Sequence, residues 1–392
     1  MQTNNEVKKL SGLLIFLMAC SCGLIVANLY YAQPLVGPIS SATGISAGAS
    51  GLVVTMTQIG YVIGLLFLVP LSDLIENRKL VSAILIIAVS GLITAAFAKN
   101  GFVFMSAAVL IGLGSVAAQI IVPFAAFMAP EKQRGQIVGK VMSGLLLGIM
   151  LARPAASLLT GLWGWQTVFA VSAVINGLLA ISLFFVFPKR KPEIKVGYME
   201  IIKSLFALFR TTPVLRRRSL YQACLFGAFS LFWTTVPLWL AQHFHLSQKA
   251  IAIFALVGVA GAAAAPVAGR LADKGWTRKL TGFAFLTASF SFVLTHFFSS
   301  NTLISLILFS IAAVLLDMAV SGNLVLGQQA IYSLGNEIRG RVNGVFMAVF
   351  FIGGAIGSAL GGWSFAYGQW TMTSIFGIVL PLLAFIYYLT EK

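Results

Sequence analysis

The chain has 392 residues, of which 59% are hydrophobic and only 9% are charged, and its mean hydropathy is +0.96. Soluble globular proteins carry roughly 25% charged residues. This composition excludes a soluble globular protein, because no soluble core could bury so much apolar surface, and it indicates that the lipid bilayer is the solvent.

Twelve apolar segments are long enough to be membrane-spanning helices, since a helix needs about 20 apolar residues to cross the hydrocarbon core. The runs are continuous rather than alternating, which favours helices over a β-barrel. In chain order the predicted spans cover residues 10–33, 47–71, 80–98, 101–127, 136–160, 165–187, 218–242, 247–270, 280–299, 302–332, 341–366 and 369–389.

The formal net charge of +16 suggests nucleic-acid binding, but the placement of the charges argues against it. Given the predicted spans, Lys99 and Lys249 lie in loops on one side of the membrane, and Arg153 lies inside a span. The other 23 of the 26 Lys and Arg residues fall on the opposite side, together with both termini. This positive-inside pattern predicts cytoplasmic termini and contact with anionic lipid headgroups.

The three cysteines, Cys20, Cys22 and Cys224, all fall inside predicted spans, so no disulfide framework is expected. The first span has full spanning length and no clear cleavage site follows it. We therefore expect it to be retained rather than removed as a secretory signal.

A polar loop motif occurs twice and divides the chain into two similar halves. Residues 69–80 read VPLSDLIENRKL and residues 269–280 read GRLADKGWTRKL, and apolar segments flank both copies. Duplicated helix bundles are a common plan of secondary transporters. We expect an N-terminal six-helix bundle at 1–187, a cytoplasmic linker at 188–217 and a C-terminal six-helix bundle at 218–392.

Within the linker, residues 198–210 have apolar side chains at helical spacing with basic residues between them. This pattern predicts an amphipathic helix on the cytoplasmic headgroup surface. A solvated linker is the alternative.

These features together resemble the major facilitator superfamily over essentially the whole chain. The second loop copy matches the family's GxLaDrxGrr-like signature, with Gly269, Asp273 and Arg278 in place, whereas the first copy has Val69 and Pro70 at the opening glycine. The resemblance implies an all-α membrane protein with twelve transmembrane helices in two pseudo-symmetric six-helix bundles. It also implies transport by alternating access between the two sides of the membrane.

Finer motifs resemble the twelve-span drug:proton antiporters and their sugar-efflux relatives. They are NLYYAQP at 28–34, the Gly-rich GLLLGIMLARPAAS at 144–157 and GWQ at 164–166. Ala108 departs from that group, which carries at this position an arginine associated with proton coupling. The resemblance implies proton-coupled efflux of a drug-like or amphipathic compound. The alternatives are a sugar or metabolite transporter, either exporter or uniporter, and a transporter-derived sensor.

Asp317 is the acidic residue that lies deep inside a predicted span. A charge near the bilayer centre is costly, so such a residue is expected to face a cavity or a partner. Ser321 and Gln328 share its face of the helix. We predict that Asp317 carries the coupling proton. A structural hydrogen-bond anchor between helices is the alternative.

Arg153 is the cation that lies deep inside a span, and it is a candidate for substrate binding. At 1.5 Å per residue it lies about 22 Å above the cytoplasmic start of its span, whereas Asp317 lies about 9 Å above the cytoplasmic face. The difference of roughly 13 Å predicts that the two do not form a salt bridge. Pairing with carbonyl groups freed near Pro154, or reaching the membrane surface, is the alternative role.

The other cavity candidates come from spans that line the cavity in the family. An aromatic wall with a few polar groups suits a small amphipathic solute. Tyr31 and Trp233 could instead belong to an aromatic belt at the membrane surface. The candidates are Asn28, Tyr31, Gln33, Gln119, Trp233, Ser321, Asn323 and Gln328.

The resemblance also implies a gating role for charged loop residues. Asp73 and Asp273 would each face the positive N-terminal end of a helix in the other half and hold the cytoplasmic side closed. A solvated positive-inside surface is the alternative for the basic residues. The basic members of these clusters are Arg78, Lys79, Arg134, Arg278, Lys279 and Arg339.

No metal, cofactor or enzymatic site is expected. His243 and His245 form an HxH pair without further nearby ligands, and the chain has neither a Walker A sequence nor a plausible Ser-His-Asp arrangement. The expected partners are a small-molecule substrate, protons and the lipid bilayer, without nucleic acid. We expect a multi-pass monomer in the cytoplasmic (inner) or plasma membrane.

Overall fold

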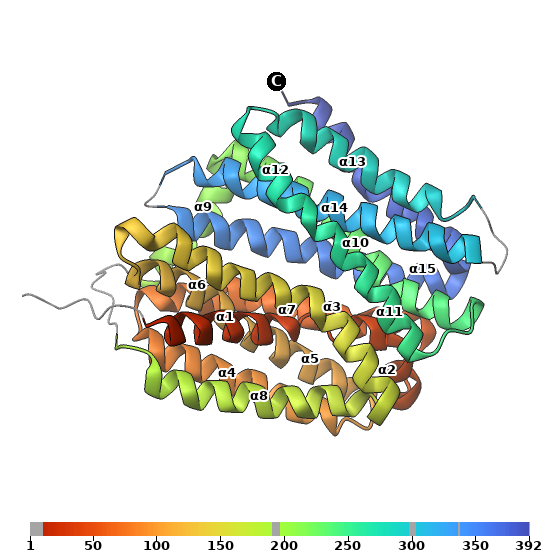
Figure 1. Ribbon diagram of the computed structural model, residues 1–392, viewed down its shortest axis with the longest axis horizontal. Coiled ribbons are helices and arrows are strands. Elements are labelled where there is room, and N and C mark those ends of the chain that lie inside the picture. The colour runs from red at the N-terminus through yellow and green to blue at the C-terminus, as the bar shows by residue number, and fades with distance from the viewer. Residues whose placement is uncertain (1–10, 190–196, 298–302, 336–337, 392) are drawn as a thin grey trace, which may run out of the picture.

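The computed structural model describes residues 11–189, 197–297, 303–335 and 338–391, and these residues form helices and no strand. In Figure 1 the N-terminal half lies below the C-terminal half, and most helices run along the long axis of the molecule. The N-terminal half consists of α1 (Gly12–Ala27), η1 (Gln33–Leu35), α2 (Val36–Thr43), η2 (Ala47–Ala49), α3 (Leu52–Ile63), η3 (Gly64–Leu68), η4 (Val69–Asp73), α4 (Asn77–Ala96), α5 (Gly101–Ser115), α6 (Ala117–Met128), η5 (Glu131–Gln133), α7 (Arg134–Trp163) and α8 (Trp165–Val186). The linker helix α9 (Tyr198–Thr211) leads to α10 (Pro213–His243), α11 (Gln248–Val259), η6 (Ala260–Ala263), α12 (Ala264–Asp273), α13 (Thr277–Leu294), α14 (Leu303–Tyr332) and α15 (Arg339–Leu389).

Within the described residues, each predicted span lies mainly on helix. Among the residues that the structure describes, nine helices are apolar and long enough to cross a membrane. The last of them, α15, is interrupted at Gly368 and Gln369, whose backbone angles are not helical, so it comprises the last two predicted spans. The 16-residue α1 and the 18-residue α13 form the spans that remain. The predicted all-α membrane fold is confirmed.

The same close helix contact recurs in both halves. In the N-terminal half, Gly148 of α7 lies so close to Gly23 of α1 that an added Cβ would overlap the backbone of α1. In the C-terminal half, Gly357 of α15 lies in the same way against Gly227 of α10. Small residues allow such close approach of helices. These glycines therefore pack helices together within each half.

The halves are sealed against each other at one end of the molecule, which we call the far face. It is the face opposite α9, and the linker face is the one that carries α9 and the end of α15 (Figure 1). Gly51, at the start of α3, lies against Gly362 of α15. A Cβ added to either glycine would overlap the backbone of the other half. Deeper in the molecule the Thr55 and Ser358 hydroxyls lie 2.8 Å apart. The rings of Tyr61 and Phe351 are 4.5 Å apart between centroids.

Beyond Tyr61 the halves separate and leave a cavity of about 510 Å³ toward the linker face. The N-terminal half lines it with residues of η3, η4 and α6, the C-terminal half with the first turn of α15, and α9 covers it. The molecule is therefore closed at the far face and hollow at the linker face. The lining residues are Leu65, Val69, Pro70, Ser72, Asp73, Gln119, Pro123, Glu200, Ile201, Ser204, Leu205, Gly340, Arg341, Asn343 and Gly344.

The linker helix is held mainly by protein contacts. Ile202 and Leu205 are buried in one apolar cluster with Phe346 of α15. The Tyr198 hydroxyl donates to the carbonyl of Phe67 in the N-terminal half at 2.8 Å. The predicted amphipathic helix is present, but its apolar side packs on both halves rather than lying only on headgroups. Residues 190–196 of the predicted linker lie outside the described residues.

Candidate functional site

Three helices from the two halves bring a charged pair together in the interior. Arg153 comes from α7 of the N-terminal half, and Asp317 comes from α14 of the C-terminal half. The Arg153 Nη2 atom lies 3.5 Å from Asp317 Oδ2. Trp233 of α10 donates its indole N–H to Asp317 Oδ1 at 2.9 Å. The carboxylate therefore has one partner from each half of the molecule.

The guanidinium group of Arg153 also lies on an aromatic wall. Its Cζ is 3.8 Å from the centroid of the Trp233 ring and 5.0 Å from that of Phe229. Arg153 is 4% exposed and Asp317 is 8% exposed. Within the described part of the chain, Arg153 Nε and Nη1 have no hydrogen-bond partner. The site thus offers two buried donors beside an apolar surface.

Two glycines allow the pair to be enclosed. A Cβ at Gly258 of α11 would lie 2.9 Å from Asp317 Oδ2 and would also contact the Trp233 ring. A Cβ at Gly261 of η6 would lie 2.5 Å from the Asp317 Cβ. The helix that runs from α11 through the 3-10 turn η6 into α12 can therefore pass directly over the carboxylate.

The prediction that Arg153 and Asp317 lie too far apart is wrong. The depth estimate counted Arg153 from the cytoplasmic start of its span and Asp317 from the outer start of its span, across a core of about 30 Å. However, α7 and α14 each have 30 residues and extend beyond the hydrocarbon core, so the two counts do not share one origin. Counted from their ends at the far face, Arg153 lies about 15 Å deep and Asp317 about 21 Å deep at 1.5 Å per residue. A long arginine side chain closes the remaining gap of about 6 Å.

The predicted cavity residues of the N-terminal half do not gather at this pair. Asn28 accepts a hydrogen bond from Ser172 at 2.6 Å and contacts Asn176, so it joins α1 to α8. Tyr31 is half-buried and packs against the apolar core. Gln33 is fully buried, and among the described residues its side-chain amide has no hydrogen-bond partner. Gln119 donates to the Tyr61 hydroxyl at 3.0 Å and lines the linker-face cavity.

The predicted polar cavity residues of α14 lie in three different surroundings. Ser321 stays beside the pair and donates to the backbone carbonyl of Asp317. Asn323 donates to Gln222 of α10 at 2.7 Å and lies in a different groove. Gln328 donates to Asn343 at 3.5 Å near the linker face.

The charged loop residues have mostly local partners in this conformation. Arg78 pairs with Glu76 at 3.1 Å and lies over the Phe184 ring, and Lys79 lies 3.9 Å from the same glutamate. Asp73 lines the linker-face cavity together with the first residues of α15. The gating role of these residues stays a prediction.

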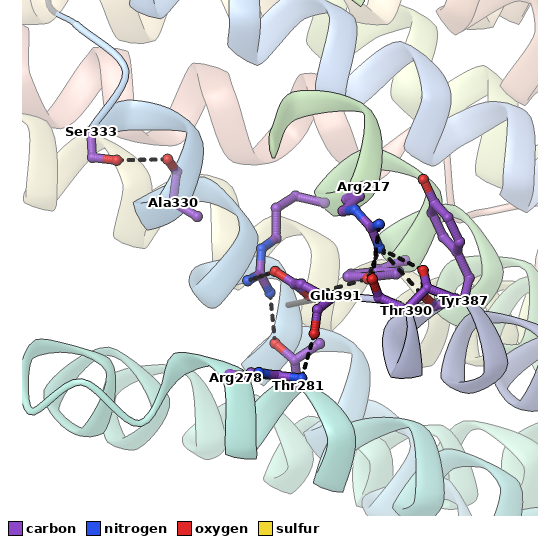
Figure 2. Close-up of polar contacts among 10 residues, drawn as sticks. Arg217, Arg278, Thr281, Ala330, Ser333, Tyr387, Thr390 and Glu391 are labelled. Atoms are coloured by element: carbon purple, nitrogen blue, oxygen red, sulfur yellow. Dashed lines mark hydrogen bonds and ion pairs between the residues drawn. The ribbon is translucent and has the colours of Figure 1, made fainter. Parts of the chain in front are cut away.

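In the C-terminal half, Asp273 accepts a hydrogen bond from Gln329 of α14. Arg278 donates to the backbone carbonyl of Glu391, near the chain end, where several polar contacts converge (Figure 2). Lys279 lies over the Trp276 ring at 5.7 Å, and Arg339 donates to the carbonyl of Tyr332 at 3.3 Å. Arg134 is exposed at the start of α7.

Gln58 of α3 is a contact between the halves that sequence reasoning missed. Its amide donates to Ser230 of α10 at 2.9 Å and accepts from Ser358 of α15 at 3.2 Å. It is 1% exposed. A fully polar side chain in the middle of the apolar stretch 47–71 was the signal that could have found it.

Comparisons of the sequence and the fold with known proteins identify relatives of this chain. The profile described as Major Facilitator Superfamily matches residues 15–332 and 222–392. A protein of Escherichia coli (strain K12) named as a transporter, YgaY, is 38% identical over 375 residues, which cover 95% of this chain and 94% of that protein. SCO4007 of Streptomyces coelicolor, also named as a transporter, is 29% identical over 356 residues, covering 90% and 82% of the two chains. The crystal structure of a bacterial homologue of the human lysosomal transporter Spinster, inward-facing and unoccupied, superposes with a TM-score of 0.76 at 15% identity over 95% of both chains.

Proposed function

This chain belongs to the Major Facilitator Superfamily of membrane transporters, and from that premise we propose that it is a proton-coupled exporter of small amphipathic compounds. The observation that carries the proposal is the buried ion pair between Arg153 and Asp317, which joins the two halves. Buried charges within a membrane most often mark substrate or proton pathways.

The pair supplies a chemical link between proton binding and movement of the halves. While Asp317 is ionised, it attracts Arg153 across the boundary between them. Protonation of Asp317 removes that attraction and leaves Arg153 in need of another acceptor. A substrate with a hydrogen-bond acceptor can then take that place, with its apolar body against Phe229 and Trp233.

Export requires that the substrate enters from the cytoplasmic side. The positive-inside pattern predicts that both termini and the linker face lie in the cytoplasm, and the cavity of about 510 Å³ lies at that face, beneath α9. The two bundles, 1–187 and 218–392, rock about the pair, and the linker 188–217 connects them. Asp73 and Asp273 with the basic loop residues hold the cytoplasmic side closed when the far face opens. One bundle pair forms a complete path, so the monomer in the inner membrane is the working unit.

The test uses purified protein in liposomes that contain a trapped pH dye. A pH gradient is imposed and cationic drugs, neutral sugars and amino acids are added in turn, to the wild type, to Asp317→Asn and to the exposed control Glu131→Gln. We expect proton flux with cationic or amphipathic drugs in the wild type and in Glu131→Gln, and none in Asp317→Asn. Substrate-driven flux that persists in Asp317→Asn excludes this residue as the coupling site.

A sugar or metabolite is the second candidate substrate. Gln33 and Thr234 are fully buried, and among the described residues their side chains have unpartnered polar atoms that suit a polyhydroxylated solute. Flux with sugars alone in the same assay would favour this candidate.

A further inference from the structure

The linker helix α9 forms one wall of the cavity at the linker face. Its residues Glu200, Ile201, Ser204 and Leu205 line the cavity, and their spacing places them on one side of the helix. The other walls belong to η3, η4 and α6 of the N-terminal half and to the first turn of α15. Because α9 covers the cavity, its position decides how far the cavity communicates with the solution at that face.

The attachment of α9 differs between the two halves. Ile202 and Leu205 are 6% and 4% exposed and belong to an apolar cluster, to which, among the described residues, the N-terminal half adds the partly buried Leu66. Arg341 of α15 also donates to Ser204 Oγ at 3.2 Å. The other buried members of the cluster come from α10, α14 and α15, and they are Leu215, Ile331, Val342, Val345 and Phe346. Apolar burial therefore fixes α9 to the C-terminal half.

A hydrogen bond ties the beginning of α9 to the N-terminal half. The Tyr198 hydroxyl donates to the backbone carbonyl of Phe67 in η3 at 2.8 Å. The element that follows, η4, is a 3-10 helix, in which the N–H of residue 70 would donate to the carbonyl of residue 67, but Pro70 has no N–H. The first loop copy departs from the family signature at Val69 and Pro70, and this departure leaves the carbonyl of Phe67 free to accept from Tyr198.

We propose that α9 is a lid on the cavity that moves with the C-terminal half, and that the hydrogen bond from Tyr198 to Phe67 is the latch that holds it against the N-terminal half. When this bond breaks, the halves can separate at the linker face while the apolar cluster of α9 stays intact. One net hydrogen bond changes an equilibrium by about 2- to 12-fold, so the latch is weak enough to open and close in each conformational cycle. The lid requires neither proton coupling nor a particular substrate, so it can fail or hold independently of the proposed function.

The test measures how fast a cysteine in the cavity wall reacts with a polar maleimide, at concentrations where the rate follows the open fraction. Leu65→Cys places a thiol at a buried position of that wall, in a background without Cys20, Cys22 and Cys224. The full-length protein is held in nanodiscs without substrate and without an ion gradient. Tyr198→Phe keeps the ring and removes the latch, and it should raise the labelling rate by about 2- to 12-fold. An unchanged rate overturns the proposal.

Two controls separate release of the latch from a general loosening of the protein. Tyr332→Phe deletes the same group, but the Tyr332 hydroxyl donates to Asn343 within the C-terminal half at 2.9 Å, so labelling at position 65 should not change. The second control moves the thiol to Ala355→Cys, which is buried at the far-face seal and should not react faster when Tyr198→Phe is added. Faster labelling in either control contradicts a latch at the linker face.

The half that α9 follows is decided by a matched deletion at its other polar contact. Ser204→Ala removes the hydrogen bond from Arg341 and leaves the apolar cluster in place. Since that cluster holds α9 on the C-terminal half, we expect Ser204→Ala to label at position 65 at the rate of its parent. Faster labelling in Ser204→Ala would mean that α9 leaves the C-terminal half when the cavity opens, and it overturns the proposal.

Discussion

Arg153 of the N-terminal half and Asp317 of the C-terminal half form an ion pair 3.5 Å long in the interior of the molecule. Both side chains are almost fully buried, and Trp233 contacts both of them. A buried ion pair is stabilising only while both members are present, because removal of one leaves the other charged and without a partner. The pair therefore makes the two halves sensitive to the charge of a single carboxyl group.

Neutralising one member should cost more stability than neutralising both. Asp317→Asn is expected to lower the free energy of unfolding by about 3–5 kcal/mol, since it leaves Arg153 buried and unpaired. The double variant Arg153→Gln/Asp317→Asn should recover most of this loss. Apparent melting temperatures, measured in one detergent, should decrease from the wild type to the double variant to the single variant. A double variant no more stable than Asp317→Asn would show that the pair carries no coupling between the halves.

Trp233 makes one interaction with each member of the ion pair, and two substitutions can separate the contributions of these interactions to stability. Trp233→Phe removes the hydrogen bond to Asp317 but keeps an aromatic ring beneath Arg153, and should cost about 1.5–3 kcal/mol of folding stability. Trp233→Leu also removes the ring and should cost a further 0.5–2 kcal/mol, roughly the value of a cation–π contact. Melting temperatures in the same detergent give the comparison. Equal losses in the two variants would mean that the ring does not stabilise Arg153.

The fold could be predicted from the sequence because length and hydropathy alone decide whether a segment can span a membrane. The site could be predicted only in part. Arg153, Trp233 and Asp317 were each identified as polar or charged residues within apolar spans, but the contact between Arg153 and Asp317 was missed. Helices of 30 residues overhang the bilayer, and a position counted from one end carries an error of several ångströms.

Other residues could not be placed because helix rotation is not visible in the sequence. Asn28 and Asn323 were both predicted to line the central cavity, yet Asn28 joins α1 to α8 and Asn323 joins α14 to α10. Which face of a uniformly apolar helix points inward depends on neighbouring helices, and the hydrophobic pattern does not specify it.

Gly51 and Gly362 set the closest approach of the halves at the far face. In Gly51→Ala the new Cβ overlaps the carbonyl of Ser358, so the closed far face should be destabilised by about 1–3 kcal/mol, a 5- to 150-fold shift toward opening. The readout is labelling of the variant Ala355→Cys by a membrane-impermeant maleimide, in a background without the native cysteines. Gly177→Ala is the control, because nothing lies within 4 Å of its added Cβ. Faster labelling in the control, or none in Gly51→Ala, contradicts the assignment of the seal.

Gln58 should contribute to the seal through the groups it satisfies. Gln58→Leu leaves the buried Ser230 hydroxyl without its partner and should cost about 1–3 kcal/mol of stability. Adding Ser230→Ala removes the stranded hydroxyl and should restore part of the loss. The measurement is a double-mutant cycle on melting temperature. Additive effects of the two substitutions would show that the amide and the hydroxyl do not interact.

The end of α15 should stabilise the C-terminal half through Glu391. Its carboxylate pairs with the buried Arg218 at 2.9 Å and accepts from the Tyr221 hydroxyl at 3.1 Å. Its backbone carbonyl accepts from Arg278 (Figure 2). Glu391→Gln keeps the size of the side chain but removes its charge, and Arg218 then lacks its counter-ion. We expect a loss of about 1–3 kcal/mol of folding stability, the cost of weakening a charged hydrogen bond at a buried partner.

Glu131→Gln changes the same group at an exposed position and should leave the melting temperature unchanged, because exposed charges contribute little. Raising the salt concentration should reduce the difference between Glu391→Gln and the wild type only slightly, since Arg218 is shielded from solvent. A difference that disappears at high salt would mean that the contact is a surface ion pair and does not anchor the end of the chain.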